Sequence, residues 1–233
     1  MIIGMRQNRS IPMPVQAITV GYSIKEEIAH SVTHGIGVLM SVIGLTTLIV
    51  YSSMYGDAWH IVGSSIYGVT LIALYTSSTL YHMVTAPDVK RVLQRLDHAA
   101  IFLLIAGTYT PFTLGNLRGG WGWTLFGMVW SIAIAGMIME LIVKKRYKRI
   151  SIALYLGLGW LVMFATEPMI ANVAPSGLML LLVGGLFYSL GVIFYVWKTL
   201  VFHHAIWHLF VLAGSTFHFF AVLLYVIPDG SAA

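Results

Sequence analysis

The stretch His203-His204-Ala205-Ile206-Trp207-His208 stands at the start of a long apolar segment that runs from Ala205 to Ile227. Such a segment is long enough to cross a bilayer as a helix, which needs about 20 apolar residues. On a helix, His204 and His208 lie on one face about a turn apart, which suits two ligands of one divalent metal ion. Packed, hydrogen-bonded histidines show the same spacing. Because ionisable groups at membrane depth are costly, the position indicates a functional site.

The composition is that of an integral membrane protein. Of the 233 residues, 58% are hydrophobic and 9% are charged, where an ordinary globular chain has about 25% charged residues. At about 20 residues per span, the chain has room for one domain of roughly seven helices. Cysteine is absent, which excludes disulfides, thiolate nucleophiles and thiolate metal ligands and leaves His, Asp and Glu as strong ligands.

The hydropathy pattern predicts an all-α fold, a seven-transmembrane helix bundle. Its apolar runs lie at about 28–51, 59–84, 97–116, 121–142, 151–167, 176–198 and 205–227. The fifth run is short and is interrupted by Gly157, Gly159 and Trp160. We therefore expect a membrane domain at 25–227, a short cytoplasmic tail at 1–24 and a short external tail at 228–233.

The basic residues predict the orientation. With seven spans, twelve of the thirteen Lys and Arg fall on one side, and only Arg118 falls on the other. By the positive-inside rule the N-terminus is cytoplasmic and the C-terminus is outside. The positive charges lie between apolar runs rather than along one face, so we expect lipid headgroups, and no nucleic acid, as partners. Glu26 and Glu27 open the first helix, where the helix dipole favours them.

Several polar residues fall at one depth, near the cytoplasmic side. The second run ends with Ser78 and His82, the third begins with Asp97, and the last begins with His204 and His208. Three neutral imidazoles and a nearby carboxylate are typical of catalytic zinc, which keeps one position open for water. Calcium and magnesium prefer oxygen ligands, so zinc fits best, with other divalent transition metals left open.

These motifs resemble those of the progestin and adiponectin receptor (PAQR) family. They are Ser78-x-x-x-His82, Leu96-Asp97-His98 followed by 106–112 (AGTYTPF), and His204-x-x-x-His208 followed by Phe217-His218-Phe219. The opening Glu26-Glu27-Ile28, the stretch 33–37 (THGIG) and the lack of a large N-terminal domain resemble the bacterial hemolysin III branch most closely. The likeness extends over about residues 22 to 227.

The resemblance implies seven helices, a cytoplasmic N-terminus and a zinc ion held by His82, His204 and His208. It also implies that Asp97 acts through the zinc-bound water and that Ser78 forms a hydrogen bond beside it. The missing receptor-type N-terminal domain speaks against hormone binding.

The predicted chemistry is hydrolysis. Zinc in a shell of histidines lowers the pKa of its water toward about 7, Asp97 suits a general base, and Ser78 suits an oxyanion or water partner. The constellation resembles that of alkaline ceramidases, which implies cleavage of an amide or ester bond in a lipid from the bilayer. We therefore expect a zinc-dependent lipid amidohydrolase of the plasma membrane, with membrane lipids as partners and a role in lipid or fluidity homeostasis. Homo-oligomerisation is left open.

Two other classes of function stay open. Zinc that only joins the second and seventh helices would suit a sensor or receptor-like protein, with Asp97 orienting a ligand. Transport or pore formation is the other class, because His30, His34 and His218 spread imidazoles across the membrane depth. We expect His34 and His218 to hydrogen-bond between helices, His98 to lie outside the ligand set, and His30 and His203 to be solvated at the interface.

Overall fold

The computed structural model describes residues 21–143 and 147–227, and all regular structure in these ranges is helical. The helices are α1 (Ile24–Tyr55), α2 (Ala58–Met83), α3 (Pro87–Leu114), α4 (Gly120–Ile142), α5 (Lys148–Gly159), the 3-10 helix η1 (Leu161–Ala165), α6 (Thr166–Asn172), α7 (Pro175–Val196) and α8 (His203–Tyr225). The expected tails at 1–24 and 228–233 lie outside the described residues, apart from 21–24.

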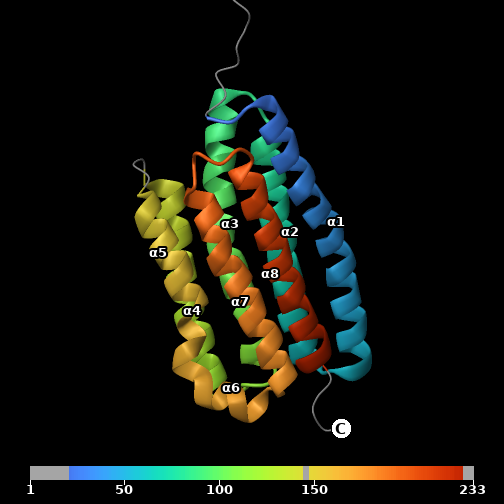
Figure 1. Ribbon diagram of the computed structural model, residues 1–233. Coiled ribbons are helices and arrows are strands. Elements are labelled where there is room, and N and C mark those ends of the chain that lie inside the picture. Colours follow the sequence, from blue (N-terminus) through green and yellow to red (C-terminus); the bar gives the residue numbers. More distant parts are fainter. Residues whose placement is uncertain (1–20, 144–146, 228–233) are drawn as a thin grey trace, which may run out of the picture.

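The helices form one elongated bundle in which the segments run side by side along a common axis (Figure 1). Six described segments are long and apolar enough to cross a membrane, with Lys148–Asn172 counted as one of them. Helix α3 runs along the same axis between α2 and α4 and completes seven (Figure 1). The prediction of an all-helical, seven-helix membrane bundle is therefore confirmed.

The third helix begins ten residues earlier than the apolar run at 97–116 predicts. It begins at Pro87, because proline suits the first turn of a helix, where its missing N–H has no intrahelical partner to lose. Its first turns carry charged residues, among them the exposed ion pair between Arg91 and Asp88. A search for apolar runs overlooks such turns, so the predicted start was wrong.

The fifth segment breaks where the glycines and Trp160 predict an interruption. Helix α5 ends at Gly159, and a 3-10 turn joins it to α6. The Tyr109 hydroxyl on α3 lies 2.7 Å from the Gly159 carbonyl oxygen and 2.9 Å from the Val162 amide nitrogen, so it can donate to the first and accept from the second. Backbone groups at membrane depth need such partners, so Tyr109 stabilises the break.

The predicted site residues gather at the end of the bundle where α1 and α8 begin. The N-terminus of α1 is fixed by a capping box, in which Ser23 and Glu26 bond each other's backbone N–H groups. The end of α2 and the start of α3 lie at the same end (Figure 1). Helices α2 and α3 approach closely, since a Cβ on Gly107 would lie 2.1 Å from the Thr70 hydroxyl oxygen. Three parts of the chain that are distant in sequence thus meet there: the start of α1, the connection from α2 to α3, and the start of α8.

Candidate metal centre

The structure brings the three predicted metal ligands together. His82 lies in the last turn of α2, and His204 and His208 lie in the first two turns of α8. One ring nitrogen from each lies within 4.8 Å of the other two, and all three side chains are buried. Imidazole nitrogens suit zinc and several other divalent transition metals. The described residues therefore contain a group that could hold a metal ion.

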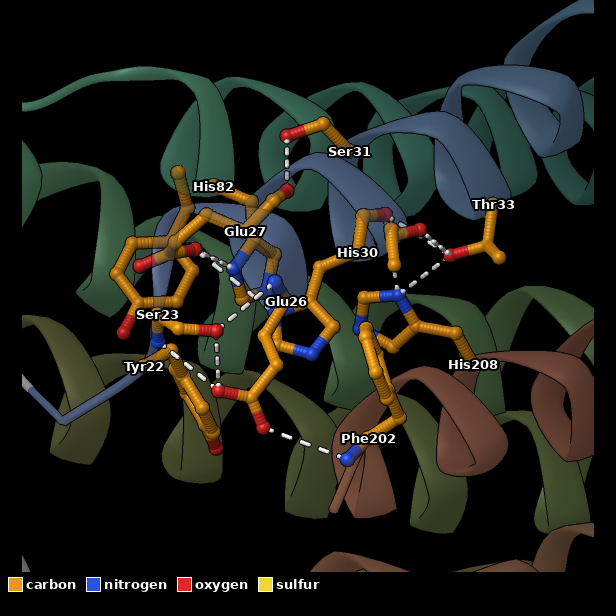
Figure 2. A network of polar contacts seen from close by, with 12 residues as sticks. Tyr22, Ser23, Glu26, Glu27, His30, Ser31, Thr33, His82, Phe202 and His208 are labelled. Carbon is orange, nitrogen blue, oxygen red and sulfur yellow. Dashed lines mark hydrogen bonds and ion pairs between the residues drawn. The ribbon is translucent and has the colours of Figure 1, made fainter.

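Hydrogen bonds orient two of these rings so that Nε2 is left for a metal. His208 Nδ1 lies 3.2 Å from the His30 carbonyl oxygen, to which only an N–H can donate. Likewise, His82 Nδ1 lies 2.7 Å from Glu27 Oε2 (Figure 2). Within the described ranges, His82 Nε2 is buried without a hydrogen-bond partner. A metal-bound histidine almost always donates its other N–H to a carboxylate or carbonyl, so the arrangement fits a bound metal ion.

Glu27 and Lys90 form a buried ion pair beside the cluster. Glu27 Oε1 lies 2.9 Å from Lys90 Nζ, and both side chains are about nine-tenths buried. The ammonium also donates to the carbonyls of Tyr81 and Val84 at the end of α2. The sequence predicts Glu27 in the opening of the first helix, and Lys90 falls between the apolar runs at 59–84 and 97–116. Both descriptions were incomplete, because only packing of α1 against α2 and α3 buries the two charges together.

Asp97 and Ser78 lie at the end of an internal cavity that His204 and His208 also line. The cavity measures about 350 Å³, and most of the residues along it are apolar. It extends to His218, which lies ten residues beyond His208 on α8, or about 15 Å at the rise of an α-helix. The cavity is therefore long and mainly apolar, and Asp97, His204 and His208 line the part of it that lies toward the start of α8.

The cavity is lined in part by residues on the outside of the bundle. Met163 of η1, Ile170 of α6 and Leu182 of α7 line it and are 60%, 65% and 45% exposed. In a membrane such apolar side chains face lipid. The cavity can therefore be reached from the side, near the break in the fifth segment.

Three other histidines, His34, His98 and His218, differ in their hydrogen bonds. His218 Nε2 lies 3.1 Å from the Leu181 carbonyl oxygen on α7, so the predicted interhelical bond is confirmed. His34 has no hydrogen-bond partner among the described residues and instead stacks on His208, with ring centroids 3.5 Å apart. That prediction was wrong. His98 Nδ1 lies 2.6 Å from the Gln94 carbonyl oxygen, within its own helix.

His30 and His203 are not solvated as predicted. Their exposed fractions are 0% and 3%. His203 donates from Nδ1 to the Phe194 carbonyl at 2.9 Å, whereas His30 lies among the rings of the candidate ligands (Figure 2). The signal in the sequence was the spacing Glu27-x-x-His30, which places a carboxylate and an imidazole on one helix face. Glu27, His30 and His82 form a second group that could hold a metal ion.

Comparison with known proteins agrees with the fold and the motifs. The family described as Haemolysin-III related matches residues 22–219. The chain is 50% identical over 206 residues to the hemolysin-3 homolog of Bacillus subtilis (strain 168), covering 88% of this chain and 97% of the relative. It is 48% identical over 208 residues to hemolysin-3 of Bacillus cereus, covering 89% and 95%.

A more distant relative is human. The chain is 30% identical over 212 residues to the monocyte to macrophage differentiation factor of Homo sapiens, covering 86% of this chain and 84% of that protein. The likeness to the bacterial relatives is higher and extends over nearly their whole length. With a family match over most of the chain and a fold of seven helices, this membrane protein belongs to the haemolysin-III related family.

Proposed function

We propose that this protein is a zinc-dependent hydrolase that cleaves an amide or ester bond in a membrane lipid. One observation carries the proposal: Asp97, Ser78 and two members of the histidine cluster, His204 and His208, line one mainly apolar cavity that opens toward the side of the bundle. An apolar chamber with a few convergent polar groups suits a ligand with a long acyl chain. The polar end would then receive the scissile bond.

The roles of the residues follow from their chemistry. A zinc ion held by His82, His204 and His208 would supply Lewis acidity and lower the pKa of bound water. Asp97 is the carboxylate that lines the cavity at this end and would take and return a proton as general base and acid. Ser78, one turn from His82 on α2, would donate a hydrogen bond to the developing oxyanion.

The proposal is tested by turnover of defined lipids. We would incubate detergent-purified, zinc-loaded protein with ceramides, other N-acyl lipids and lysophospholipids, and measure released fatty acid by mass spectrometry. Asp97→Asn should keep the metal and lower the rate at least about 100-fold, the usual contribution of a positioned base. Metal content is measured on the same samples.

Two results would contradict the hydrolase. Equal rates in wild type and Asp97→Asn would remove Asp97 from the mechanism. Absence of turnover for every lipid in a protein that holds one zinc per chain would favour the second candidate, a sensor in which zinc joins the helices. The observation that favours this candidate is that the cluster links α1, α2 and α8.

For the setting, we propose the plasma membrane, with the metal centre near the cytoplasmic leaflet. The support is the charge pattern of the chain. Lys148 and Lys198 lie at the end of the bundle where α8 begins, whereas Arg118 lies at the opposite end. The positive-inside rule places the first end in the cytoplasm. Accessibility of single cysteines introduced at positions 198 and 118 to a membrane-impermeant thiol reagent tests this orientation.

A further inference from the structure

Two lysines from different parts of the chain lie against one tyrosine ring beside the histidine cluster. The ammonium groups of Lys148 and Lys198 lie 4.2 and 5.4 Å from the ring centroid of Tyr195. Lys148 opens α5, and Lys198 follows the end of α7, so the two charges come together only because these helices pack. The Tyr195 ring lines the cavity, and its centroid lies 5.8 Å from that of His204. A pair of cations therefore stands beside the polar part of the cavity.

The two ammonium groups repel each other. Burial and, after it, the neighbouring Lys148 ammonium lower the pKa of Lys198 to about 8, so Lys198 is mainly protonated at neutral pH. Its ammonium donates to the Tyr22 hydroxyl at 3.3 Å. No carboxylate in the part of the chain that the structure describes lies within ion-pair distance of Lys198. An anion bound by the two lysines would offset their repulsion.

The lysine pair stands at one end of a seam between α5 and α7. The two helices lie next to each other (Figure 1). Beyond the end of α5, Trp160 Nε1 donates to the Ser189 hydroxyl of α7 at 3.0 Å. Between this contact and the lysines, Ile152 and Leu156 of α5 and Val192 of α7 line the cavity. The seam is thus mainly apolar and has its two cations at one end.

This distribution of polarity matches that of a lipid with an anionic headgroup. The headgroup of a membrane lipid lies at the interface, where basic residues attract it, and its chain lies at membrane depth. A phosphate held by Lys148 and Lys198 would lie one tyrosine ring away from His204. Only the glycerol backbone separates the phosphate of a glycerophospholipid from its ester carbonyl, which suits this short separation.

We propose that Lys148 and Lys198 form a headgroup subsite that binds the phosphate of an anionic membrane lipid. Selection of a substrate by this subsite rests on the proposed function, whereas binding of the lipid does not. The subsite favours glycerophospholipids and lysophospholipids over neutral ceramides. Basic residues anywhere at this end of the bundle attract anionic lipids in general. These two differ in that they share one ring that lines the cavity.

The test compares two lipids with the same chain, an ether-linked lysophosphatidylglycerol and the corresponding neutral alkylglycerol. An amide or ester hydrolase does not cleave the ether bond, so binding is measured apart from turnover. Native mass spectrometry of the purified protein gives both affinities, and wild type should bind the anionic lipid more tightly. Lys148→Gln/Lys198→Gln should weaken that binding about 30-fold, since each basic residue near a membrane surface contributes roughly a factor of five. Binding of the neutral lipid should not change.

Three controls separate the subsite from charge in general. Lys25→Gln/Arg91→Gln removes two exposed cations from the same end of the bundle and should leave the preference for the anionic lipid unchanged. Lys148→Arg/Lys198→Arg keeps both charges and should retain most of the preference. Inorganic phosphate in excess should not displace the lipid, because it lacks the chain that fills an apolar cavity.

Three outcomes would overturn the headgroup subsite. Equal affinity of wild type for the two lipids would mean that no headgroup is recognised. An equal loss in Lys25→Gln/Arg91→Gln would assign the preference to surface charge, and displacement by inorganic phosphate would assign the lysines to a soluble anion. Each leaves the proposed hydrolase intact, with a neutral lipid as its substrate, whereas absence of turnover would overturn the hydrolase and leave the binding result intact. If the glutamine variant does not fold, the two lipids on wild type and on the arginine variant still decide.

Discussion

The two ends of the bundle differ in how far their charged and polar groups are buried and in whether those groups have hydrogen-bond partners. At the far end, Asp57 caps α2, bonds His60 and pairs with Arg118 at 2.7 Å, and both members of the pair are about 45% exposed. At the end where α1 and α8 begin, Glu27 and Lys90 are buried, and several imidazole nitrogens have no hydrogen-bond partner among the residues that the structure describes. The far end has the satisfied, solvated contacts of a structural cap. The end with the histidine cluster keeps unsatisfied polar groups at a free-energy cost that a bound ligand would offset.

The largest expected effect is loss of the metal from the histidine cluster. His204→Ala/His208→Ala removes two of the candidate ligands, and we expect zinc to fall from about one per chain to almost none. Elemental analysis of protein purified in detergent measures it. His218→Ala, on the same helix and bonded to Leu181, should leave the metal content unchanged. Equal zinc in the double variant would place the metal elsewhere.

Glu27→Gln should have the next largest effect, and it acts in two ways. It weakens the acceptor for His82 Nδ1, so zinc affinity should fall about 10- to 100-fold. It also leaves the buried Lys90 without a carboxylate, which should lower the free energy of unfolding by about 3 kcal/mol. Competition with a chromophoric zinc chelator measures the first, and thermal unfolding in detergent measures the second.

A double variant separates these two effects. Glu27→Gln/Lys90→Met removes the unpaired ammonium, so stability should recover while zinc affinity stays low. Glu26→Gln is the neighbouring control, because Glu26 belongs to the capping box of α1 rather than to the cluster. Unchanged zinc affinity in Glu27→Gln would mean that Glu27 serves only as the partner of Lys90.

The smallest effect is expected at the far end. Arg118→Ala removes one partner of an exposed ion pair, which should lower the free energy of unfolding by at most about 1 kcal/mol and leave the zinc content unchanged.

Partial burial raises the pKa of Asp57, but the hydrogen bonds from Arg118 and His60 outweigh it and hold the pKa well below its usual range. The contribution of the pair is therefore present at neutral pH and is lost as the pH falls below about 4. Unfolding of both proteins at pH 7 and pH 3 checks this, and a difference that grows toward pH 3 would contradict it.

Much of the fold could be predicted because hydrophobic runs in a membrane protein report spans directly. The start of α3 could not, since its charged first turns are stabilised by contacts outside the helix: Lys90 with Glu27 and Arg95 with the Leu141 carbonyl. The break near Gly159 was visible as a cluster of glycines. Its partner, the Tyr109 hydroxyl, was not, because 50 positions in the sequence separate Tyr109 from Gly159.

The candidate site shows the same division. The spacing of His204 and His208 places them on one helix face whatever the rest of the chain does, because the period of a helix is a local property. The rest of the site depends on how α1, α2, α3 and α8 pack. This packing brings His82 to the two histidines, places Asp97 and Ser78 along the cavity, and buries His30 and Glu27 beside the cluster. The sequence by itself determined the membrane spans and the kinds of ligand available. Only the tertiary structure decided which buried nitrogens face one another, since burial and mutual orientation arise from contacts between helices distant in the chain.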